Sequence, residues 1–164
     1  ISSKDFEIHT SLDFSMHKAD RQEFCIYYLA FKFNKECTAP LTTPALMLDK
    51  TILLLNELPI SELDYLYDSF ITGLKRCNAL FEGELWRRTK RMNYKFLAVS
   101  ACICLSEYEQ SLSWFKSHQK NGIRFLESLY EEKTEPYPKY KVNYIIQYYI
   151  RRINNFLREL EYEN

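Results

Sequence analysis

The side chains best suited to bind another molecule form a basic run near the middle of the chain. Five positive charges fall within the nine residues 87–95, on Arg87, Arg88, Lys90, Arg91 and Lys95. Cationic groups at this density bind phosphates, on RNA or on an inositol lipid, and the flanking rings of Trp86 and Tyr94 could stack on bases. The alternative, which we favour, is a solvated helix face with those rings buried, because blocks of like charge on a helix are usually solvated.

Tyrosine is the second residue type that could carry function. The chain has 13 Tyr, and two of them, Tyr144 and Tyr148, fall off the strongest apolar face of the last expected helix. Exposed Tyr is enriched at protein interfaces, because it buries a large area at a small entropic cost. Packing at the rim of the same domain is an equally weighted alternative. The candidate partner-binding residues are therefore Trp86, Arg87, Arg88, Arg91, Tyr144 and Tyr148.

Residues typical of catalysis or metal binding are sparse. The three His do not lie near a nucleophile with a third orienting group, and the three Gly are too isolated to form a phosphate-binding loop. Neither an H-E-x-x-H zinc motif nor a calcium-binding loop is present. We therefore expect a protein that is not an enzyme, with no catalytic residues, no cofactor, no metal and no small-molecule substrate.

Composition narrows the expected partners and compartment. Lys+Arg and Asp+Glu both number 22, so no overall field attracts nucleic acid or an anionic membrane. No stretch approaches the roughly 20 apolar residues of a membrane span, and residues 1–6 do not resemble a signal peptide. The five Cys form no C-x-x-C pair, which favours reduced core thiols in a cytoplasmic protein. Because the chain does not begin with Met, it is open whether it is a fragment of a longer protein.

The elements that must position these side chains are helices. The chain has few Gly and Pro residues, and its apolar side chains recur mainly at spacings of three and four. We expect a lead-in at 1–12 and one all-α domain of about seven helices over 13–164, arranged as a bundle or short superhelix. The expected helices cover 13–37, 45–57, 61–81, 84–105, 106–119, 123–132 and 141–162. Apolar residues almost encircle 45–57, which predicts burial on most of its faces.

Local signals predict several helix boundaries. Pro44 is suited to a first helical position, and Ser61 to the N-cap of the following helix. Gly83 is expected to end or kink that helix. Ser106, with an acidic residue three positions later, predicts an N-cap at the turn after 84–105. Gly122 is interpreted as the end of the helix that follows this turn.

The segment 98–115 resembles a tetratricopeptide repeat. In that family, a helix with small residues leads through a turn to a Tyr, then a small residue three positions later, then an aromatic residue four positions after that. Tyr108, Ser111 and Phe115 follow this order, and Ala101 supplies the small residue on the first helix. Val99 departs from the pattern, as do His118 and Ile123. The resemblance implies stacked helical hairpins and a protein-binding function.

Short matches scattered along the chain also resemble the family of TRAPP tethering complex subunit 12. They are Phe14-Ser15-Met16, Leu48-Asp49, Leu85-Trp86-Arg87, Ala101-Cys102 and Tyr108. This resemblance implies a cytoplasmic scaffold subunit in vesicle transport. The sequence therefore predicts a scaffold or adaptor that binds other protein subunits; the alternative is a module that binds nucleic acid or phosphoinositide through its basic patch.

Overall fold

The described part of the chain is built from helices. A computed structural model describes residues 18–33, 44–89, 91–132 and 142–163. The elements are α2 (Lys18–Phe33), α3 (Pro44–Glu57), α4 (Ile60–Phe81), the 3-10 helix η2 (Glu82–Trp86), α5 (Met92–Glu107), α6 (Leu112–Ser117), α7 (Gln119–Glu131) and α8 (Val142–Tyr162). These residues contain no strand, which confirms the expected all-α class. The expected lead-in at 1–12 lies outside the described residues.

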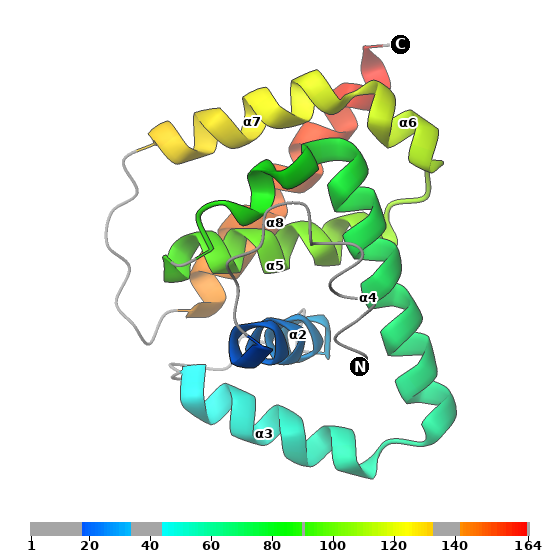
Figure 1. The fold of residues 1–164 in the computed structure, drawn as a ribbon, viewed down its shortest axis with the longest axis vertical. Helices are drawn as coiled ribbons and strands as arrows, with labels where there is room; N and C mark the ends of the chain where they lie inside the picture. The colour runs from blue at the N-terminus through cyan, green and yellow to red at the C-terminus, as the bar shows by residue number, and fades with distance from the viewer. Residues whose placement is uncertain (1–17, 34–43, 90, 133–141, 164) are drawn as a thin grey trace.

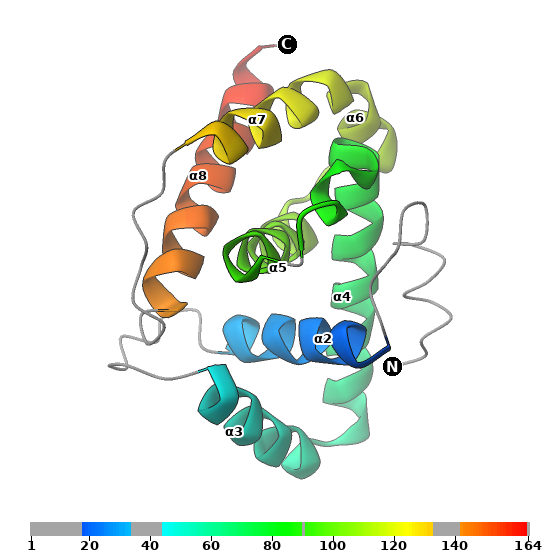
Figure 2. The same ribbon diagram turned by 60° about the vertical axis from the view of Figure 1, so that its left-hand side comes forward.

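Helix α5 forms the centre of the fold. It packs against α4, α8 and α2, and each of its side chains from Phe96 to Leu105 is buried. Figures 1 and 2 show α6 and α7 near one end of the long helix α4 and α3 near its other end. A helix that is apolar on every face is stable in water only when neighbours cover every face, and α5 has those neighbours.

Two glycines allow the helices to approach closely. A Cβ atom on Gly73 of α4 would lie 2.5 Å from the carbonyl oxygen of Cys102 in α5. A Cβ on Gly122 of α7 would clash with the carbonyl oxygen of Leu80 in α4. The sequence-based interpretation of Gly122 as a helix end is therefore wrong, since it lies inside α7 at a contact too close for a side chain.

The buried thiols lie around the same helix contact. Cys25, Cys77, Cys102 and Cys104 are free and buried, and the Sγ atoms of Cys77 and Cys102 lie 3.8 Å apart. Burial raises the pKa of Cys25 to about 12, so this thiol stays protonated at neutral pH. The expectation of core thiols is confirmed for these four residues, while Cys37 lies outside the described residues.

Two predicted helix caps are wrong. Helix α4 begins at Ile60, after an extended Pro59 and without a side-chain cap, so Ser61 is already inside the helix. Ser106 also lies within a helix, and its hydroxyl donates to the carbonyl oxygen of Ile103 at 2.8 Å. The cap after the turn is Ser111, whose hydroxyl oxygen accepts a hydrogen bond from the Trp114 amide at 3.1 Å.

The expected helix over 84–105 is interrupted. Glu82 ends α4 with φ at 54°, a left-handed conformation that is uncommon for a residue other than glycine. Helix α4 therefore ends two residues before Gly83, and the positive φ belongs to Glu82 rather than to the glycine. A 3-10 helix and a turn follow, and α5 begins only at Met92. Arg87 and Arg88 consequently lie in a turn, Arg91 is at the N-cap of α5 and Lys95 is inside α5, so these charges do not line one helix face.

The expected repeat hairpin is present only in outline. Helix α5 is followed by a turn and by α6, but α6 has six residues and packs chiefly against α4. The Tyr108 ring stacks on Trp114 at 5.8 Å and lies edge-on to Phe115 at 6.2 Å. These contacts hold the turn closed. Tetratricopeptide-like stacking of hairpins stays a prediction.

Helices α3 and α8 differ in how well their apolar residues are covered. The apolar residues expected on one face of α8 are buried from Ile145 to Leu160, which confirms that prediction. In α3, by contrast, Leu53 is 66% exposed and Leu54 is 49% exposed. The prediction that α3 is buried on most faces is therefore wrong, because among the described helices α3 packs mainly against α2.

Candidate protein-binding surface

The C-terminal end of α7 contacts the turn that carries the basic run. The guanidinium of Arg88 lies over the ring of Tyr130, 4.5 Å from its centroid. The Tyr130 hydroxyl donates to the carbonyl oxygen of Glu84 at 3.2 Å, and the Tyr94 ring packs edge-on against Tyr130 at 4.9 Å. Burial, partly opposed by the charge of Arg88, raises the pKa of Tyr130 to about 12. Tyr130 thus holds the basic turn against α7.

The basic run does not present its charges as one block. Lys95 is buried and forms an ion pair with Glu23 of α2 at 3.4 Å. Arg87 is exposed and pairs with Glu84 at 3.0 Å. Lys90 lies outside the described residues. Arg88 and Arg91 are exposed, so the charges available at this turn are fewer than the sequence indicates.

Trp86 does not belong to the accessible surface. Its side chain is 3% exposed and its indole N–H donates to the amide oxygen of Asn78 at 3.0 Å. The ring packs edge-on against Phe24 at 5.6 Å. The prediction of Trp86 as a contact residue is therefore wrong in this conformation, because α2 and α4 already cover it. The alternative drawn from the sequence, a buried Trp86, is correct.

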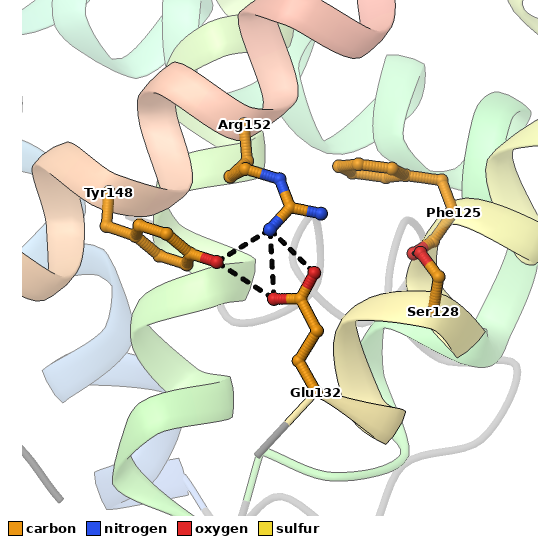
Figure 3. A network of polar contacts seen from close by, with 5 residues as sticks. All are labelled: Phe125, Ser128, Glu132, Tyr148 and Arg152. Atoms are coloured by element: carbon orange, nitrogen blue, oxygen red, sulfur yellow. Dashed lines mark hydrogen bonds and ion pairs between the residues drawn. The ribbon is translucent and has the colours of Figure 1, made fainter. Parts of the chain in front are cut away.

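A second group of polar side chains connects α7 to α8 (Figure 3). Arg152 forms an ion pair with Glu132 at 2.6 Å and donates a hydrogen bond to the Tyr148 hydroxyl oxygen at 2.6 Å. The Tyr148 hydroxyl donates to the Glu132 carboxylate at 2.8 Å. Burial, reinforced by this hydrogen bond to Glu132, raises the pKa of Tyr148 above its ordinary value. All three side chains are half-buried, so the network is fixed and still accessible.

Both groups include a residue from the C-terminal end of α7, where Tyr130 and Glu132 are two residues apart in the sequence. We call the combined set the tyrosine–arginine surface: Arg88, Tyr130, Glu132, Tyr148 and Arg152. Tyr144, one turn before Tyr148 on α8, is 61% exposed. The structure therefore brings two candidates from distant parts of the sequence, Arg88 and Tyr148, to the same end of one helix.

Three members of this surface were not singled out from the sequence. Tyr130 and Glu132 lie at a helix end next to a proline-rich segment, and Arg152 looked like an ordinary residue of the polar face of α8. The spacing of Tyr148 and Arg152, four residues apart on one helix, was a local signal for their contact. Nothing local indicated Glu132, which reaches them from α7.

Comparisons with known proteins do not assign a function to this surface. Comparison with protein-family models, curated proteins and solved structures finds no significant match for the chain. Within the described residues, no three His, Cys, Asp or Glu side chains are grouped so as to hold a metal ion. None of the described helices combines the length and the apolar character needed to cross a membrane.

Proposed function

We propose that this protein is a non-enzymatic subunit that binds another protein through the tyrosine–arginine surface. The observation that carries the proposal is the fixed arrangement of Arg and Tyr side chains at the end of α7. Arg88 rests on Tyr130, and Arg152 is held by Tyr148 and Glu132. Tyr and Arg dominate the energies of protein interfaces. Side chains that are already ordered lose less entropy when a partner binds.

Charge favours a protein partner over a polyphosphate. The Arg87 and Arg152 guanidiniums each face a carboxylate, Glu84 at 3.0 Å and Glu132 at 2.6 Å. A carboxylate beside a guanidinium repels phosphate, while it can accept hydrogen bonds from a partner's amides and cations. Arg88 and Arg91 remain the basis of the rival function, binding of nucleic acid or phosphoinositide.

Affinity purification of the tagged protein tests the proposal. We expect defined protein partners to co-purify with the wild type and to be lost with Tyr148→Ala or with Arg88→Glu, since both residues belong to this surface. Lys75→Glu, an exposed charge change on α4, is the matched control and should retain the partners. The circular dichroism of the two charge variants should match that of the wild type, because both positions are exposed. The same match for Tyr148→Ala would show that loss of this half-buried ring leaves the helices intact.

The rival function predicts a different pattern. Binding to single-stranded RNA or to vesicles containing phosphoinositide should then fall steeply with salt and survive Tyr148→Ala. That result, with no protein partner that depends on Tyr148, would replace the proposal by the rival.

We further propose membrane traffic as the setting, on the resemblance to the TRAPP subunit 12 family alone. A cytoplasmic location agrees with the free thiols of the four described core cysteines, since thiols stay reduced there. The same purification tests this point: other subunits of a vesicle-tethering complex should be among the co-purifying chains. Their absence from a partner set that depends on Tyr148 would contradict the setting and leave the protein-binding function standing.

A further inference from the structure

The outward face of helix α3 has apolar side chains in its middle and opposite charges at its two ends. Thr51, Leu55 and Leu58 are buried or half-buried toward the core. Lys50, Leu53, Leu54 and Glu57 are all exposed, and their spacings of three, four and seven place them on one stripe of the helix. Two leucines therefore stand in water between a cation at one end of the stripe and an anion at the other.

The charges at the ends of this stripe have no counterpart within the described residues. Neither Lys50 nor Glu57 takes part in an ion pair in that part of the chain. Ile60, the first residue of α4, is also largely exposed and adds to the apolar surface beyond Glu57. It follows Glu57 by three residues, a distance of at most about 11 Å along the chain.

The order of the stripe is complementary to itself in one orientation. When two copies of α3 pack antiparallel about a two-fold axis between Leu53 and Leu54, Lys50 of each copy lies opposite Glu57 of the other, because both residues lie equally far from the axis. Leu53 of each copy then faces Leu54 of the other. A parallel pairing would instead set Lys50 against Lys50 and Glu57 against Glu57, which is repulsive.

We infer that the outer face of α3 is a docking surface for a second copy of this chain, in an antiparallel, two-fold symmetric dimer. A contact of this kind is isologous, the commonest form among soluble homo-oligomers. One helix face with the nearby start of α4 lies at the low end of specific interfaces, below about 1,200 Å² in total, so the dimer is weak and concentration-dependent. The inference is independent of the proposed tyrosine–arginine surface, which lies at the end of α7.

Sedimentation of the whole chain over about 1 μM to 1 mM tests the dimer. We expect the wild type to pass from monomer to dimer within this range. Lys50→Glu alone and Glu57→Lys alone should each weaken dimerisation at least about tenfold, because each change creates two like-charge contacts across the axis. Leu53→Asn should weaken it as well, by removing apolar contact. All four positions in the stripe are exposed, so the circular dichroism should not change.

Mixing the two charge variants gives the decisive measurement. In a mixture of Lys50→Glu with Glu57→Lys, both cross-axis contacts are again between opposite charges, so a heterodimer should form although neither variant dimerises alone. Lys120→Glu on α7 and Glu159→Lys on α8 are matched controls at exposed positions outside α3, and both should dimerise as the wild type does. A wild type that stays monomeric to 1 mM, or a mixture that fails to associate, would overturn the inference.

Discussion

Helices α3 and α8 are both rich in apolar residues, but only α8 is covered by the rest of the protein. Helix α8 packs along α5, and its apolar face is buried from Ile145 to Leu160. Helix α3 packs chiefly on α2, and its outer leucines stay in water. Apolar composition therefore predicts that a helix needs a partner, but not whether its own chain provides that partner. For α3, we infer that a second copy of the chain covers the outer face.

Matched leucine truncations give the largest expected contrast between the two helices. Leu157→Ala in α8 should lower the free energy of unfolding by about 2–5 kcal/mol, because Leu157 is fully buried and leaves a cavity. Leu53→Ala in α3 should change it by less than about 0.5 kcal/mol at concentrations where the protein is monomeric. Urea denaturation of both variants measures the two values. Equal losses of unfolding free energy in the two variants would show that α3 is covered in solution, contrary to the exposure of Leu53.

The close contact between α4 and α5 predicts the next largest effect. Gly73→Ala should destabilise the fold by about 1–3 kcal/mol, since the added methyl group would lie 2.5 Å from the Cys102 carbonyl oxygen. This loss occurs although alanine favours helices by about 1 kcal/mol over glycine. Asp68→Ala, at an exposed position of the same helix, is the control and should be neutral or slightly stabilising. Thermal unfolding distinguishes the two variants. A stabilised Gly73→Ala protein would mean that the helices are farther apart.

Alkaline unfolding tests whether the end of α7 belongs to the well-packed region. The folded state raises the pKa of Tyr130 to about 12 from its ordinary value of 10.0. Below pH 10 this tyrosine is protonated in both states, and its contribution to stability is fully present. As the pH rises from 10 to 12 the unfolded chain loses the proton first, so stability falls by on the order of 1–2 kcal/mol.

The matching variant is Tyr130→Phe, which removes this titration. Its stability should decline less between pH 10 and 12 than that of the wild type, as measured by urea denaturation at each pH. Identical pH dependence in the two proteins would show that Tyr130 is solvated and that the basic turn is not held against α7.

The smallest effect is expected at the polar contact between α7 and α8. Glu132→Gln removes the charge opposite Arg152 and should cost about 0.2–1 kcal/mol, because both side chains are about one-third exposed and water screens the pair. Added salt should reduce the difference between the variant and the wild type. A loss above about 2 kcal/mol would place this network among the buried contacts, contrary to its exposure.

Sequence reasoning predicted helices more reliably than it predicted their limits or their neighbours. The last helix and its buried face were predicted correctly, as was the helix that begins at Pro44. The errors at Ser106 and Gly122 have different causes. Serine can bond back to its own helix, and glycine can serve a close contact, so neither residue by itself marks a helix end.

The candidate site was predicted in part. Arg88 and Tyr148 lie at the accessible tyrosine–arginine surface, whereas Trp86 is in the core, and Glu132 was not singled out. Tyr and Arg as residue types can be read from the sequence as candidates for contact. Which of them remain accessible depends on helices that meet only in three dimensions.

The spacing of apolar residues along the chain is enough to predict that it forms amphipathic helices and which face of α8 turns inward. Helix hydrogen bonds join residues four apart, and apolar periodicity is carried by the same short segment, so both are local properties. The packing of the helices, by contrast, is what surrounds α5, covers Trp86 and leaves the outer face of α3 exposed. Burial of a side chain depends on surfaces supplied by residues far away in the sequence, and those surfaces are placed only when the helices pack.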